Sequence, residues 1–202
     1  MRSWTEHCYR SAPQGFPPPK AGLAGRQRSG HAGRMHWPAG WRERRVPVSD
    51  IRGRVAVVRR LLPARPDAVY DEWLDPGALS DRMCPRPARC RNVESEPRVA
   101  GRLQIDIEDD GVEFSVSGEY LVLDRPRQLS FSWSCTTWPD PSIKSVVNVL
   151  LEPRENEQPL MTIEHSLLPP ELVDQHEHGW TAIAQQLAEE LAATAPGHPH
   201  IR

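Results

Sequence analysis

The 202-residue chain lacks any apolar run long enough to cross a membrane as a helix, and no apolar stretch of signal-peptide length follows its first charged residues. Both absences argue against insertion into a bilayer or secretion through one. We therefore expect a soluble, cytoplasmic protein with no membrane partner.

Cysteine is also scarce. The four cysteines, Cys8, Cys84, Cys90 and Cys135, form no Cys-x-x-Cys pair and no regular framework. A domain of this length holds its core without covalent cross-links. The pattern therefore predicts no disulfide scaffold and favours a reducing compartment.

The familiar motifs for phosphate, dinucleotide and calcium binding are missing as well. The segment "GVEFSVSG" alternates like a strand, and no helix follows it to cradle a phosphate. We expect no cofactor and no metal.

Paired carboxylates are also lacking on the inner side of the predicted strands, since Asp106, Glu108 and Glu113 all alternate outward. Catalytic turnover is therefore less favoured than binding.

Charge divides the chain into two parts. Residues 1–50 hold nine Lys or Arg and three Asp or Glu, a net of +6; the remaining 16 basic and 24 acidic residues net −8, and the sum is −2. An acidic remainder argues against the coherent basic face of a nucleic-acid-binding domain. Residues 1–50 contain six prolines and six glycines, which would interrupt any helix or strand there. We therefore expect a disordered tail. Met35 is an alternative start of the translated protein. Residues 196–202 should fray.

The first folded elements begin after this tail. "RVAVVRRL", from Arg54, suits a strand. A helix should follow with Asp67 as its N-cap, and "DPG" should end it. A second short helical turn is predicted over 78–82.

Five segments then alternate with a period of two, and one long helix closes the chain. The alternating segments are "GRLQIDIED", "VEFSVSGEYLVL", "QLSFSWSC", "SIKSVVNVLLE" and "LMTIEHSLL". After Pro170 apolar residues recur at steps of three and four; this stripe comprises Leu172, Val173, His176, Trp180, Ile183, Ala184, Leu187 and Leu191. Pro196 and Gly197 should end the helix. The prediction is an α+β domain over 53–195, in which a curved antiparallel sheet wraps around the C-terminal helix.

Several phrases strengthen this prediction through a resemblance. "PDAVYDEWLDPGALSDRM", "GEYLVLDRPRQLSFSW", "MTIEHSLL" and "HEHGWTAIAQQLAEEL" resemble the START-like superfamily, also called SRPBCC, with its helix-grip or Bet v allergen fold. Within it they are similar to the branch related to the activator of heat-shock protein 90 ATPase. The resemblance covers about residues 53–193. It implies a cleft between sheet and helix that holds a hydrophobic small molecule. One departure is that Met83 and Cys84 stand where the family typically has a bulky aromatic pair.

Two histidines, His165 and His176, bear on whether the interior is a solid core or contains a binding site. His176 lies on the apolar stripe of the last helix and should face inward, whereas His178 should face solvent. His165 should lie inside, on the last strand, so the two imidazoles could meet. One interpretation is a pair of core histidines satisfied by neighbouring groups. The other is a set of polar groups in an apolar pocket. A zinc site would require both histidines and Cys135 to converge.

The predicted ligand-binding set combines these polar groups with large apolar side chains. Its members are Trp73, Met83, Tyr120, Trp133, Cys135, Met161, His165, His176 and Trp180. The leading hypothesis is binding of a small hydrophobic molecule. One alternative, found elsewhere in the superfamily, is an aromatase or cyclase in which His165 or His176 is the general base and Tyr120 polarises a carbonyl. The other is a chaperone-linked protein that interacts with a protein partner.

Overall fold

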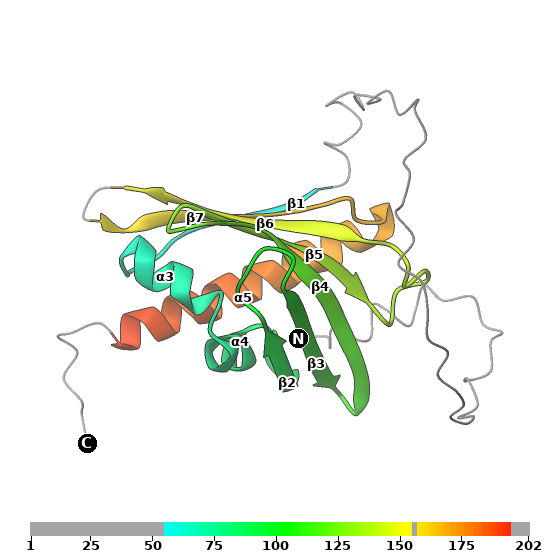
Figure 1. The fold of residues 1–202 in the computed structure, drawn as a ribbon. Coiled ribbons are helices and arrows are strands. Elements are labelled where there is room, and N and C mark those ends of the chain that lie inside the picture. The colour runs from blue at the N-terminus through cyan, green and yellow to red at the C-terminus, as the bar shows by residue number, and fades with distance from the viewer. Residues whose placement is uncertain (1–54, 155–156, 195–202) are drawn as a thin grey trace, which may run out of the picture.

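A computed structural model describes residues 55–154 and 157–194. It contains a seven-stranded antiparallel sheet in the order β1-β7-β6-β5-β4-β3-β2, two short helices after β1, and one long closing helix. Figure 1 shows the sheet arching over α5, with α3 and α4 beside that helix. The predicted fold class is confirmed. The predicted tail over 1–50, the Met35 start and the end of the helix at Pro196 lie outside the described residues.

The strands coincide closely with the alternating segments of the sequence. Six of them were predicted, and their bounds are β1 Ala56–Leu61, β3 Arg102–Asp109, β4 Val112–Asp124, β5 Gln128–Cys135, β6 Ser145–Pro153 and β7 Pro159–Ser166. Each has one face buried because every second residue is apolar. Asp110 and Gly111 join β3 to β4 with φ angles of 53° and 79°, the left-handed pair that a two-residue hairpin requires.

The seventh strand was not predicted. β2, Arg89–Ser95, forms the edge of the sheet beside β3. Its residues are mostly exposed, and only Cys90 and Val93 of its apolar side chains pack against the core. Charged edge strands of this kind are common because they discourage pairing with other chains. They also leave no alternating pattern to recognise.

The two short helices begin where their prolines lie. α3 spans Pro66–Glu72 and its N-cap is Arg65, so the predicted cap at Asp67 is wrong; Pro66 already occupies the first turn. α4 spans Pro76–Arg82, and the Asp75 carboxylate accepts a hydrogen bond from the Ala78 amide at 2.8 Å. "DPG" therefore starts the second helix as well as ending the first.

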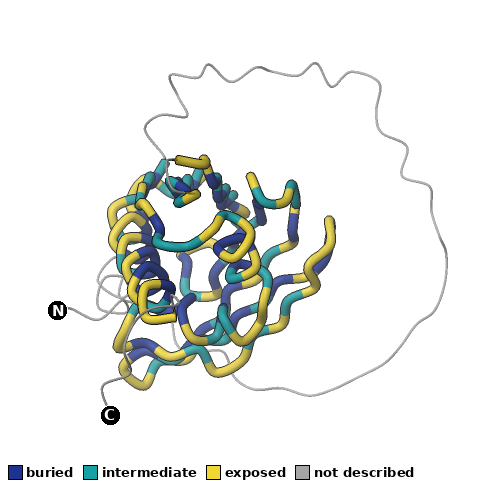
Figure 2. The backbone as a smooth tube through the Cα atoms, turned by 90° about the vertical axis from the view of Figure 1, so that its left-hand side faces the viewer, coloured by how far each residue is buried: buried dark blue, intermediate teal, exposed yellow. Residues whose placement is uncertain are grey.

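The closing helix α5, Val173–Thr194, follows the short 3₁₀ turn η2, Pro170–Leu172. The predicted stripe is buried from Leu172 to Leu191, apart from the half-buried Val173. Figure 2 shows buried positions along the side of the helix that faces the sheet and exposed positions on its outer side. No helix in the described part of the chain is both long and apolar enough to cross a membrane.

A disulfide joins Cys84 to Cys90, with their Cα atoms 6.0 Å apart. The prediction of a chain without disulfides is therefore wrong. The reason is local: the turn between α4 and β2 brings the two residues together across only six positions, and this spacing matches no common framework. Cys135, on β5, is buried and is not part of this bond.

Candidate functional site

The centre of the grip is filled by aromatic rings from the sheet and the helices. Trp133 of β5 packs edge-on against Trp180 of α5 with ring centroids 5.3 Å apart. Trp73, at the end of α3, lies 6.3 Å from Trp180 and 6.5 Å from Phe131. All four side chains are almost fully buried. Two residues of the predicted set, Trp133 and Trp180, thus form the middle of the core.

The two buried histidines meet, as the sequence predicted. The ring centroids of His165 and His176 are 4.8 Å apart. His165 is on β7, His176 is in the first turns of α5, and only the short η2 turn lies between these elements. Trp138 packs edge-on against His176 at 5.7 Å. His178 is exposed, as expected.

Hydrogen bonds at both ring nitrogens fix the tautomer of His165. Its Nδ1 accepts from the Trp180 indole N–H at 3.0 Å. Its Nε2 lies 2.7 Å from the Ser145 hydroxyl, which itself donates to the Trp133 carbonyl at 3.0 Å. Nε2 must therefore carry the proton and donate it to Ser145, because the hydroxyl hydrogen is already used. His165 is a neutral residue that links β5, β6, β7 and α5.

His176 is held in the opposite tautomer. Its Nδ1 lies 2.8 Å from the Leu172 carbonyl, which can only accept, so Nδ1 carries the proton. Burial lowers the pKa of His176 to about 4, while this hydrogen bond partly opposes the shift. Burial also lowers the pKa of His165 well below its usual value, and the nearby His176 adds to that effect. Both rings are neutral at physiological pH.

The depressed pKa values predict acid sensitivity. In the unfolded chain both histidines titrate near 6.5, so below that pH the unfolded state binds protons that the folded state does not. The free energy of unfolding is therefore highest above pH 6.5. It decreases as the pH is lowered from 6.5 to about 4, where His176 becomes protonated in the folded protein. We expect the free energy of unfolding to drop by about 2 kcal/mol per histidine between pH 7.5 and pH 5.0.

Urea unfolding at the two pH values measures this drop. His178→Gln is the matched control, because it removes an exposed imidazole from the same helix. Equal stability of the wild-type protein at both pH values would contradict the assignment of two neutral core histidines.

Other members of the predicted set lie apart from the histidines. The Tyr120 hydroxyl lies 2.8 Å from Ser95 Oγ, which in turn donates to the Leu74 carbonyl. Cys135 Sγ lies 3.1 Å from Thr137 Oγ1, and Met161 is a fully buried core residue of β7. No group of three or more His, Cys, Asp or Glu residues in the described ranges is placed to hold a metal ion. The zinc alternative for His165, His176 and Cys135 therefore does not meet its condition of convergence.

A small cavity lies between α3, α4 and α5, at the edge of the aromatic core. Its volume is about 10 Å³, and its wall includes Trp73 and Met83 of the predicted set together with Ile183 and Leu187 of α5. This volume is about that of one water site. The Trp73 indole N–H is buried and has no hydrogen-bond partner among the described residues. Larger hollows of about 300 and 350 Å³ lie elsewhere over the sheet and are lined largely by polar residues.

Polar contacts close the cavity between α4 and α5. Arg82, buried at the end of α4, makes ion pairs with Glu72 and with Glu190, the latter at 2.9 Å. Burial lowers the pKa of Arg82 from its usual value, and the Glu190 carboxylate opposes that shift. The two carboxylates keep the buried guanidinium charged, as a buried charge requires.

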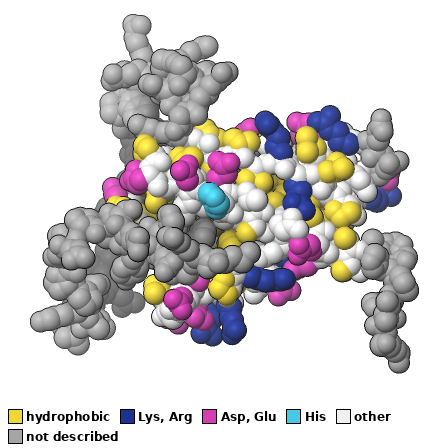
Figure 3. All heavy atoms as spheres, turned by 180° about the vertical axis from the view of Figure 1, so that it is seen from behind, with side chains coloured by type: hydrophobic (Ala, Val, Ile, Leu, Met, Phe, Trp, Pro, Cys, Tyr) yellow, Lys and Arg dark blue, Asp and Glu magenta, His cyan; other side chains and the backbone are white. Residues whose placement is uncertain are grey.

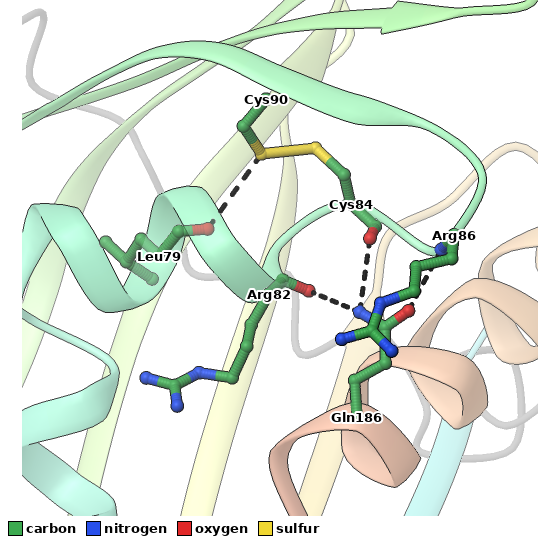
Figure 4. Close-up of a disulfide and its surroundings, with 6 residues drawn as sticks. All are labelled: Leu79, Arg82, Cys84, Arg86, Cys90 and Gln186. Atoms are coloured by element: carbon green, nitrogen blue, oxygen red, sulfur yellow. Dashed lines mark hydrogen bonds between the residues drawn. A yellow bond between two sulfur atoms is a disulfide. The ribbon is translucent and has the colours of Figure 1, made fainter. Parts of the chain in front are cut away.

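Gln186 of α5 makes a second set of polar contacts between α5 and the end of α4. Its amide nitrogen donates to the carbonyls of Arg82 and Cys84 at 3.3 and 3.2 Å, and its oxygen accepts from the Arg86 amide at 2.9 Å. Figure 4 shows this side chain reaching from α5 to the loop after α4. Sequence reasoning missed both Gln186 and Arg82. Their signal in the sequence was weak, because Gln186 is one polar residue beside the apolar stripe and Arg82 is one of 23 arginines.

The fold and this cleft define a helix-grip domain of the START-like type. Residues 63–192 match the family described as Activator of Hsp90 ATPase homolog 1-like protein. The match covers more than half of the chain, so the chain belongs to that family.

Solved structures show the same fold. A protein from Chromobacterium violaceum is 22% identical, with a TM-score of 0.60 over 67% of this chain and 96% of its own. The AHSA1 protein from Silicibacter pomeroyi is 22% identical, with a TM-score of 0.61 over 69% and 98%. DynU16, a protein of the dynemicin biosynthetic locus, is 19% identical, with a TM-score of 0.55 over 68% and 47%. No curated protein matches the sequence.

Proposed function

We propose that this protein binds a small, largely apolar molecule between α4 and α5, next to Trp73 and Met83. The observation that carries the proposal is the cavity at that place. Its lining is mostly apolar apart from the ion-paired Glu72 and Arg82, and it includes a buried tryptophan whose indole N–H has no partner among the described residues. Buried donors usually find an acceptor. A ligand with a carbonyl or hydroxyl oxygen would supply one.

Binding requires α4 to move away from α5. Ligand pockets usually enclose about 300 Å³ or more, whereas this cavity encloses about 10 Å³. The wall formed by α4 is the part that can yield, because it is a seven-residue helix attached to α5 chiefly through Arg82 and Gln186. The sheet side of the core is instead fixed by continuous strand pairing.

The cyclase alternative receives less support from the residues. Both nitrogens of His165 are engaged, by Trp180 and Ser145, and the Tyr120 hydroxyl is engaged by Ser95. His176, the other candidate base, is almost fully buried, and its Nδ1 donates to the Leu172 carbonyl. A general base needs a nitrogen that can reach a substrate proton.

No observation specifically favours a protein partner. Acidic and basic side chains are interspersed over the face drawn in Figure 3, and the absence of a nucleic-acid partner stays a prediction.

Titration with the neutral fluorophore N-phenyl-1-naphthylamine tests the proposal. Wild-type protein should bind it with saturable fluorescence enhancement. Ala78→Leu should weaken binding by about tenfold or more, because a leucine there fills the space that the probe needs and each 1.4 kcal/mol is a factor of ten.

Leu121→Ala is the matched control, since Leu121 is an exposed apolar residue on β4, away from the cavity-lining residues. It should bind the probe as the wild type does. A wild-type protein without saturable binding, or an Ala78→Leu variant that binds equally well, would overturn the proposed function.

A further inference from the structure

The disulfide and the Gln186 contacts hold the same short segment from two sides. Cys84 follows the last residues of α4, and its sulfur is bonded to Cys90 in edge strand β2. The backbone of residues 82–86 makes three hydrogen bonds with Gln186 of α5. Figure 4 shows both attachments on this one loop. The covalent bond ties the loop to the sheet, and the amide ties it to the closing helix.

This loop directly adjoins the wall of the cavity. Leu79, Arg82 and Met83 line the cavity, and Cys84 comes immediately after them. Cys90 Sγ also lies 3.9 Å from the Leu79 carbonyl, so the disulfide packs against α4 itself. Any movement of α4 away from α5 must therefore stretch or carry along the disulfide-bonded loop.

We propose that Cys84 and Cys90 form a reversible redox site that sets how readily α4 opens. With the bond intact, α4 is tied to β2 and opens less readily. With the bond reduced, Gln186, the ion pairs of Arg82 and the core packing of Leu79 and Met83 still hold the helix in place. This inference rests on the proposed function for its purpose, namely the admission of an apolar ligand, but the mechanical coupling can be measured without one.

The chemistry is a thiol–disulfide exchange with a low-molecular-weight thiol. A thiolate of the reductant attacks the sulfur of Cys90, which is half-buried, whereas Cys84 is almost fully buried. The S–S bond breaks, Cys84 leaves as a thiolate and takes up a proton, and Cys90 is held in a mixed disulfide. A second reductant thiolate attacks that mixed disulfide, giving the oxidised reductant as its own disulfide and the Cys90 thiolate, which is protonated. Two electrons pass to the protein, and oxidation reverses each step.

Hydrogen exchange of the full-length protein measures the coupling directly. Amides of residues 78–90 should exchange about tenfold faster or more after reduction with a phosphine, since opening the short cross-linked loop releases its conformational restraint. N-phenyl-1-naphthylamine should also associate faster with the reduced protein. The double variant Cys84→Ser/Cys90→Ser should match the reduced wild type and should not respond to the reductant.

The possible results separate the two proposals. Equal exchange over residues 78–90 in oxidised and reduced protein would overturn the redox site, whether or not the probe binds. Faster exchange on reduction without probe binding in either state would support the redox coupling and overturn the proposed function. Alkylation before and after reduction, read by mass, should show two additional reactive thiols per chain; none would overturn the redox site.

Discussion

Replacing Trp180 with alanine should lower the free energy of unfolding by about 4 kcal/mol. The side chain is 2% exposed and lies between Trp73, Trp133 and His165. Its removal leaves a large void that the neighbouring rings cannot close, because Phe131, Trp133 and His165 are fixed on paired strands of the sheet. It also leaves His165 Nδ1 without the indole N–H that it accepts.

Trp180→Phe separates volume from hydrogen bonding. It keeps much of the ring but removes the donor, so we expect a loss of about 2 kcal/mol. Thr181→Ala is the matched control, because Thr181 is the next residue of the same helix and is exposed; it should change stability by less than about 0.5 kcal/mol. Chemical denaturation at pH 7.5 gives all three values. A Trp180→Ala loss no larger than that of Thr181→Ala would contradict the packed core.

Replacing His165 with leucine should cost about 3 kcal/mol at pH 7.5. The variant leaves the buried Trp180 N–H without an acceptor and the Ser145 hydroxyl without the proton that His165 donates. The expected cost depends on pH, because the wild-type histidine itself loses stability as the pH falls below 6.5. At pH 5.0 the difference should shrink to about 1 kcal/mol.

This pH dependence distinguishes a titrating histidine from simple packing. Denaturation of His165→Leu and wild type at both pH values measures it, and His178→Leu on the exposed face of α5 serves as the control. A cost that stays constant from pH 7.5 to pH 5.0 would show that His165 is not held neutral by burial.

The sequence predicted the fold well where a regular pattern met one buried face. Alternation in "QLSFSWSC" predicts β5 to the residue, and the stripe through His176 and Trp180 predicts which side of α5 is buried. The inward direction of both histidines follows from the same periodicities. Edge strand β2 was not predicted because one side of it has no partner strand and none of its residues is fully buried.

The candidate site was harder to predict because its contacts are not periodic. The contact between Gln186 and the loop after α4 depends on how two segments pack together that are 100 or more residues apart in the sequence. The Cys84–Cys90 bond depends on the turn between α4 and β2, which no local pattern announces. Periodicity indicated that Trp133 and Trp180 face inward. It could not show that these rings fill the middle of the grip, or that a small cavity lies beside Trp73 and Met83.

The most direct test of ligand binding between α4 and α5 is an isotope-filtered nuclear Overhauser measurement on protein saturated with N-phenyl-1-naphthylamine. Binding at this place predicts contacts between the naphthyl protons and the methyl groups of Met83, Ile183 and Leu187, which line the cavity. Contacts confined to exposed apolar residues such as Leu61, Leu121 and Leu167 would contradict it.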